Sequence, residues 1–238
     1  MPRVHLTEEE TRRRVADAVV AYIADNGIGV VPDLPMERIL VSADVSRASA
    51  YRIWPGRGAF TAFALAEAAA GNVIETLDAA TALRLADEAV AARQDRLTAA
   101  AAFVAAAAAH ELAVLLRSPR WRAFVGFQAV ATATGEEPLR AALARADAQD
   151  AARLTAFYGV VGGAWGLRVQ EDARVAVLAD AARQLARGAV ARILAGGDEV
   201  AATRGHADAL AALVRGTFVE DPEGVFDRDR LEQGLTGG

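Results

Sequence analysis

The chain has 238 residues, enough for a substantial buried core in one or two domains. It contains no cysteine, which excludes disulfides, thiolate nucleophiles and cysteine-based metal sites. Its 26 basic residues are all arginines, and its net charge of −5 argues against a protein that binds nucleic acid with its whole surface.

The N-terminal residues show no signal pattern, because no apolar segment follows Arg3 and the acidic run that ends at Glu10. The alanine-rich run from Ala99 to Ala109 is hydrophobic, but alanine helices are soluble. No apolar stretch of membrane-spanning length lacks charges. We therefore expect a cytoplasmic protein with no membrane association.

The first predicted helix follows Thr7, which stands three residues before Glu10 in capping-box spacing. Apolar residues then recur at helical spacing up to Ile23, and Asn26-Gly27 ends the helix. Residues 12–14 are three arginines in its early turns. They favour either a phosphate clamp or a solvated face that neutralises the preceding glutamates.

Residues 36–43 and 47–54 are two short predicted helices, separated by Asp44-Val45-Ser46. Two short helices across a turn of this length are typical of a helix-turn-helix. The turn needs a residue that tolerates left-handed φ, which Asp44 does less comfortably than glycine. Val45 is the expected apolar plug between the helices, and Ser46 is a good N-cap for the second helix.

The second helix has two faces. Ala50, Ile53 and Trp54 share an apolar side, and the other side carries Arg47, Ser49, Tyr51 and Arg52. Arginine can pair with guanine or phosphate, and a tyrosine hydroxyl commonly meets a phosphate. The pattern suits the major groove, although a generic helical hairpin shows two-faced helices as often.

The segment from Val45 to Arg57, Val-Ser-Arg-Ala-Ser-Ala-Tyr-Arg-Ile-Trp-Pro-Gly-Arg, resembles the signature of the TetR family of transcriptional regulators. That signature runs roughly Val-Ser-x-Gly/Ala-Thr/Ser-Leu-Tyr-x-His/Tyr-Phe-x-x-Lys, and the resemblance covers about residues 10–65. The segment departs from the pattern with Asp44 for the usual turn glycine, Ala50 for leucine and Arg57 for lysine. Pro35 stands where the family often has a phosphate-binding Ser or Thr.

The resemblance implies a DNA-binding surface. We assign to it Arg12, Arg38, Ser46, Arg47, Ala48, Ser49, Tyr51, Arg52 and Arg57. Residues 1–70 hold eight arginines against nine acidic residues, so DNA affinity must come from placed arginines and should be sensitive to salt.

The rest of the chain carries helical patterns over residues 58–85, 88–116, 121–134, 135–167, 172–194 and 206–218. We expect the tail from about 220 to be loosely held, and no strand pattern is present. The sequence therefore predicts an all-α protein. An N-terminal three-helix helix-turn-helix DNA-binding domain (1–60) would precede a helical ligand-binding and dimerisation domain (61–238).

Four glycines, Gly159, Gly162, Gly163 and Gly166, interrupt one predicted helix, and each costs about 1 kcal/mol relative to alanine. They favour either close helix approach at a subunit interface, together with residues 172–194, or a kink beside a cavity. The resemblance implies a homodimer formed by the last major helices. Such a dimer would place two recognition helices about 34 Å apart on a palindromic operator.

Aromatic residues concentrate in the middle of the second region. Core packing accounts for most of them, but abundant alanine on neighbouring helices leaves volume for a pocket that would hold a small, mainly apolar effector. The candidate lining comprises Phe103, His110, Trp121, Phe124, Phe127, Gln128, Tyr158 and Trp165. His110 would be the polar handle, or else a satisfied core histidine.

The three histidines are scattered without metal-ligand spacing, and no phosphate-binding loop or nucleophile elbow is present. We therefore expect no enzyme activity, no cofactor and no metal. The sequence predicts a TetR-like regulator, implied to be a repressor, that binds double-stranded DNA as a dimer and is released by its effector. The alternative is a helical ligand- or protein-binding protein of the same fold that has lost operator binding.

Overall fold

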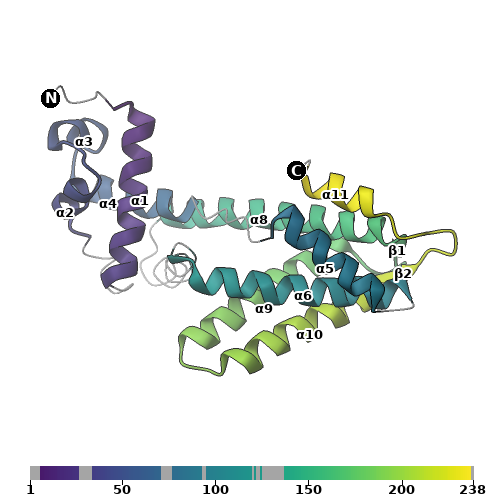
Figure 1. Cartoon of the computed structure of the whole chain (residues 1–238). Coiled ribbons are helices and arrows are strands. Elements are labelled where there is room, and N and C mark those ends of the chain that lie inside the picture. Colours follow the sequence, from purple (N-terminus) through teal and green to yellow (C-terminus); the bar gives the residue numbers. More distant parts are fainter. Residues whose placement is uncertain are drawn as a thin grey trace. The chain divides into compact units, whose positions relative to one another are not determined.

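A computed structural model describes residues 6–26, 34–70, 77–92, 95–119, 121, 124 and 137–236. These residues are almost entirely helical, which confirms the all-α prediction (Figure 1). The chain forms two compact units. The first comprises Met1–Val73 and Ser118–Ala148, and the second comprises Ile74–Arg117 and Gln149–Gly238.

The first unit contains four short helices from the N-terminal part of the chain. They are α1 (Glu8–Asn26), α2 (Met36–Ser42), α3 (Arg47–Ile53) and α4 (Arg57–Ala70). The predicted capping box opens α1, since the Thr7 amide donates to the Glu10 carboxylate at 3.0 Å and the Glu10 amide donates to the Thr7 hydroxyl at 3.1 Å. These bonds from Thr7 lower the pKa of Glu10.

Trp54 anchors the core of this unit, where it is only 3% exposed. Its ring meets Phe60 edge-on at 5.5 Å between centroids and Phe63 at 4.4 Å. Val15 and Val19 of α1 and Ile39 and Leu40 of α2 belong to the same buried cluster. The apolar sides of all four helices therefore meet around one aromatic centre, which fixes the direction of α3.

The second unit is built around α6 (Arg96–Arg117), which packs against both α5 (Ala79–Ala91) and α10 (Glu199–Thr217) (Figure 1). Its other elements are α9 (Val175–Leu194), α11 (Arg228–Thr236), β1 (Leu167–Val169) and β2 (Phe218–Glu220). The helix α8 (Glu137–Ala164) has its first part in the first unit and its last part in the second. Phe103, Trp165 and Leu178 lie at the centre of the core.

Three helix boundaries differ from the sequence prediction, and the reason is the same in each case. The expected helix over 58–85 is wrong, because Asp78 caps a new helix by accepting from the Thr81 amide at 2.8 Å. Asp95 likewise accepts from the Thr98 amide at the start of α6. Asp198 caps α10, which begins at Glu199, seven residues before its expected start at His206. The prediction missed these aspartate caps because the strong helix propensity of the flanking alanines favours an uninterrupted helix. The expected helix over 121–134 lies almost wholly outside the described residues.

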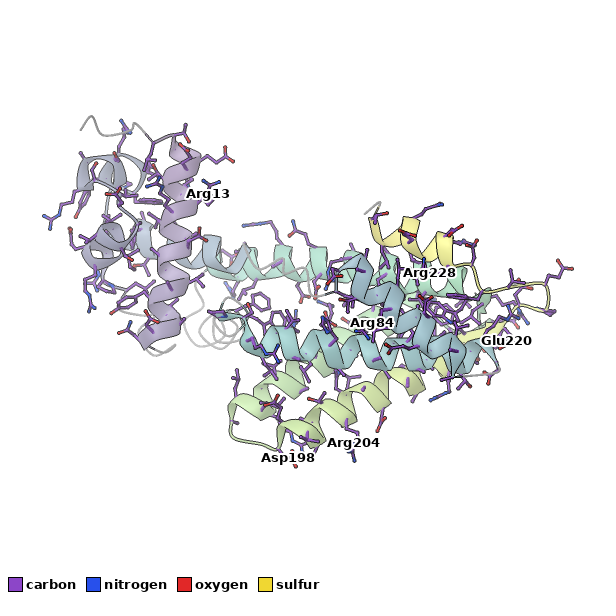
Figure 2. The ribbon with its side chains drawn as sticks, viewed as in Figure 1. Arg13, Arg84, Asp198, Arg204, Glu220 and Arg228 are labelled. Atoms are coloured by element: carbon purple, nitrogen blue, oxygen red, sulfur yellow. The ribbon has the colours of Figure 1, made fainter. Side chains whose placement is uncertain are left out.

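The tail from about 220 is not loosely held, contrary to the prediction. The strands β1 and β2 pair antiparallel, with Arg168 opposite Val219, so the chain also contains a short sheet that the sequence did not predict. Leu231 of α11 is fully buried. Arg228 contacts Asp87 of α5, 3.1 Å between Nε and the carboxylate, and Figure 2 labels Arg228 beside α5 and Glu220 in β2.

The glycine-rich end of α8 receives this C-terminal segment. A Cβ on Gly162 would stand 2.7 Å from the Phe218 ring, and one on Gly163 would stand 2.7 Å from the Arg230 guanidinium. Gly166 has a φ of +58° and closely approaches the backbone of Gly224 and Val225. These three glycines accommodate the C-terminal segment of the same chain, an explanation that neither sequence-based alternative contained. Gly159 is exposed.

The helix α6 is long and apolar enough to span a membrane by length and composition alone. Half of its apolar 18-residue stretch is buried inside the protein. Its Phe103 and Leu112 are fully buried, and Phe103 belongs to the core of the second unit. The core helix of a globular domain has the same properties, so α6 is explained by packing.

Candidate nucleic-acid interface

The turn between α2 and α3 has the geometry expected of a helix-turn-helix. Asp44 has a φ of +52° and, among the described residues other than glycine, alone adopts a positive φ. Val45 is buried beneath the turn. The Ser46 hydroxyl accepts from the Ser49 amide at 3.1 Å and donates to the Ser49 hydroxyl at 2.9 Å, so Ser46 is the N-cap of α3.

The exposed face of α3 is the one that the sequence predicted. Ala50 is fully buried and Ile53 is half-buried against the core, whereas Arg47, Tyr51 and Arg52 are exposed. The Tyr51 side chain is notable because it is a large ring that the fold leaves 47% exposed. A short helix that presents two guanidinium groups and a phenol to solvent has the chemistry to contact phosphates and base edges.

Two carboxylates lie against the arginines of this surface. Arg47 Nε stands 2.5 Å from a carboxylate oxygen of Glu37, which lies in the first turn of α2. Arg14 of α1 stands 3.9 Å from Asp44 in the turn. These carboxylates explain how the unit can present arginines without being basic overall, and the sequence prediction did not pick out Glu37.

Arg12 and Arg38 have contacts within the first unit. Arg12 pairs with Glu8 at 2.8 Å, and its guanidinium lies over the Phe63 ring at 4.9 Å. Arg38 lies over the Tyr22 ring at 5.3 Å. Cation–π contacts of this kind hold an arginine near the surface and restrict its rotamers. Arg12 therefore serves the packing of α1, which favours the second of the two roles considered for the arginines at 12–14.

Of the other residues assigned to the surface, Ala48 and Arg57 are exposed, whereas Ser46 and Ser49 are half-buried. Ala48 lies in the first turn of α3, and Arg57 is the first residue of α4. A small residue such as Ala48 allows the backbone to approach a partner closely. Arg52 has no ion pair with any described residue.

The structure divides the predicted effector-binding residues between the two units. Phe103 stacks on Trp165 at 4.8 Å in the second unit, where Tyr158 is also buried and His110 is half-buried. Trp121 stacks on Phe124 at 5.2 Å in the first unit. Phe127 and Gln128 lie outside the described residues.

The second unit holds polar groups in apolar surroundings. Burial, and then the charge of Glu111, raise the pKa of Tyr158. His206, which the prediction did not select, is 4% exposed, and its ring nitrogens have no hydrogen-bond partner among the described residues. Burial lowers the pKa of His206, so the ring is neutral at pH 7. Among the described residues no group of His, Asp or Glu could hold a metal ion.

The strained turn gives a direct test of the helix-turn-helix geometry. We expect Asp44→Gly to stabilise the protein by about 1 kcal/mol, because glycine adopts a left-handed φ without the steric cost of a Cβ. The Asp44 side chain is 97% exposed, so its loss removes little else. Urea denaturation measures the change. Asp44→Ala is the control, since it removes the same carboxylate but keeps the Cβ; equal stability of the two variants would contradict the prediction.

The fold, but not the sequence, matches a known protein. No family model and no curated protein matches the sequence. The fold is similar to a crystal structure from Rhodococcus sp., of a protein provisionally assigned as a TetR-family transcriptional regulator. The two chains are 19% identical with a TM-score of 0.53, and the match covers 87% of this chain and 99% of the other. The chain therefore has the fold of TetR-type regulators, which agrees with the resemblance noted at residues 45–57.

Proposed function

We propose that this protein is a dimeric transcriptional regulator that binds a palindromic DNA operator through α3 and is released by a small, mainly apolar effector. The observation that carries the proposal is the exposed face of α3, with Arg47, Tyr51 and Arg52 on a helix fixed by the Ser46 cap and the Trp54 core. The shared fold supports the same function. Repression is the sign of control that the resemblance implies.

The proposed division of labour follows the sequence. Residues 1–60 would bind DNA, and residues 61–238 would dimerise and hold the effector. The exposed apolar residues Val177 and Leu194 of α9 and Val200 of α10 support the last helices as the dimer surface. An effector would act by binding more tightly to a conformer in which the two recognition helices have the wrong separation, since equal affinity for both conformers shifts nothing.

We also propose that the protein is soluble and cytoplasmic and has neither catalytic activity nor a cofactor. A second candidate is a ligand- or protein-binding protein of the same fold that no longer binds an operator. The pairing of Arg47 with Glu37, together with Pro35 and Asp44, favours this candidate, because the arginine needed for DNA is already engaged.

Duplex binding at low salt separates the two candidates. We expect the wild type to bind a labelled random duplex with an affinity that falls linearly with salt on a logarithmic scale. Arg52→Ala should lower the salt slope on this duplex by about 1 if the side chain contacts a phosphate, and should weaken binding to a selected operator by about 1–3 kcal/mol if the side chain reads a base. Fluorescence anisotropy measures both effects. Arg84→Ala, an exposed arginine paired with Glu88 in the second unit, is the matched control.

If the wild type shows no salt-dependent affinity for any duplex, the regulator is excluded and the second candidate stands. Selection of bound duplexes from a random library then tests the dimer. A palindromic consensus with half-sites about one helical turn apart, roughly 34 Å, would establish two-fold symmetry on DNA.

A further inference from the structure

The acidic residue Glu37 stands where a DNA-binding surface would be expected to be basic. It lies in the first turn of α2, and its carboxylate meets Arg47 Nε at 2.5 Å. Arg47 is the first residue of α3, and the N-terminal residues of a recognition helix are those that contact base edges. Glu37 is therefore coupled to the position on α3 where sequence is read.

This ion pair contributes little to the stability of the fold. The Arg47 side chain is 73% exposed and the Glu37 side chain is 46% exposed. Pairs in such a solvated setting have small effects on folding, because water screens the charges and two long side chains lose freedom. Glu37 sits beside the core residue Met36, but its own side chain lies at the surface. A role in folding does not account for the contact.

From this contact we infer that Glu37 is a specificity-determining residue, which positions Arg47 and keeps it from phosphates of arbitrary sequence. The inference rests on the proposed operator binding by α3. The carboxylate competes with any phosphate for the Arg47 guanidinium, and it also repels the DNA backbone. Both effects weaken binding to any duplex whose phosphates Arg47 reaches only by leaving Glu37.

The operator differs because it can engage Arg47 while the pair with Glu37 is kept. Glu37 holds Arg47 at Nε, and the two terminal guanidinium nitrogens can then donate to the two acceptors that a guanine presents in the major groove. A phosphate on an unrelated duplex gives no comparable base contact, and Arg47 reaches it only by leaving Glu37. The pair thus lowers non-specific affinity, which requires it to break, more than operator affinity, and specificity is the ratio of the two.

Glu37→Gln tests the inference because it keeps the size of the side chain and removes its charge. We expect the variant to bind a random duplex about two- to fivefold more tightly than the wild type, with a salt slope steeper by about 0.9, which is one added phosphate contact. The ratio of operator to random-duplex affinity should fall by a similar factor. A purely structural role for Glu37 would not change the salt slope.

Two further variants complete the test. Glu9→Gln removes the charge of an exposed glutamate of the same unit that forms no ion pair with any described arginine, and it measures the general effect of charge. In an Arg47→Ala background, Glu37→Gln should raise random-duplex affinity no more than Glu9→Gln does. Denaturation curves should show that all these variants keep the fold.

The outcomes separate the inference from the proposed function. If the wild type and Glu9→Gln bind duplex, but Glu37→Gln binds no more tightly than Glu9→Gln, the inference alone fails. It also fails if the gain persists without Arg47. If neither the wild type nor Glu37→Gln binds any duplex, operator binding and the inference fail together. Binding by Glu37→Gln alone would mean that the carboxylate prevents DNA binding altogether, which contradicts both the specificity role of Glu37 and the proposed operator binding.

Discussion

Replacement of Trp54 by alanine is expected to destabilise the helix-turn-helix unit by about 3–5 kcal/mol. Trp54 is 3% exposed, and its ring contacts Phe60 and Phe63, so removal of the indole leaves a cavity at the centre of a small core. The position of α3 depends on that core, because few other apolar side chains of α3 are buried. Duplex binding should be lost together with the fold of α1–α4.

Amide hydrogen exchange measures this effect where it occurs. Protection should fall in α1, α2, α3 and α4, and far less in α6 and α10. Tyr51→Ala is the matched control, since it removes an exposed aromatic ring from the same helix and should change stability by no more than about 0.5 kcal/mol. Tyr51→Ala should nevertheless weaken duplex binding. Unchanged exchange in α1–α4 of Trp54→Ala would show that the aromatic centre does not hold the unit together.

Leu231→Ala is expected to destabilise the second unit by about 2–5 kcal/mol. Leu231 is fully buried, and it is the buried residue of α11, so its truncation detaches the segment that covers the glycine-rich end of α8. The contacts of Arg230 with Gly163 and of Phe218 with Gly162 depend on the position of that segment.

Chemical denaturation, followed by far-ultraviolet circular dichroism, measures the loss for Leu231→Ala. Val225→Ala is the control, because Val225 lies in the same segment but is 72% exposed and should be nearly neutral. If both variants were equally stable, α11 would be an appendage and not part of the core.

The helix-turn-helix was predictable because its signals are local. The left-handed turn at Asp44, the plug at Val45 and the cap at Ser46 each depend on residues within a few positions, and all three predictions are confirmed. The two-faced character of α3 follows from its period and is confirmed as well. That the exposed side chains of α3 contact DNA stays a prediction.

Features that depend on distant partners could not be predicted. Arg96 donates to the carbonyl oxygen of Asp221 at 2.7 Å, and its own amide donates to Glu220 at 2.6 Å, across more than a hundred residues of chain. The polar composition after residue 220 gave no sign of these contacts. The pair of Glu37 and Arg47 was also missed, because it depends on the angle at which two short helices meet.

The proposed effector site shows the same limit. The pattern of aromatics predicted a cluster, but Trp121 and Phe124 belong to one unit while Phe103 and Trp165 belong to the other. Apolar character predicts burial, and it does not specify which core a side chain joins.

The late position of Phe218, Phe226 and Leu231 in the chain has a consequence for biosynthesis. Synthesis proceeds from the N-terminus, so α5, α6 and the end of α8 leave the ribosome before the segment that completes their core. Until that segment emerges, Trp165 and the apolar side of α6 lack part of their cover. Nascent or prematurely terminated chains therefore expose an apolar surface that chaperones would recognise.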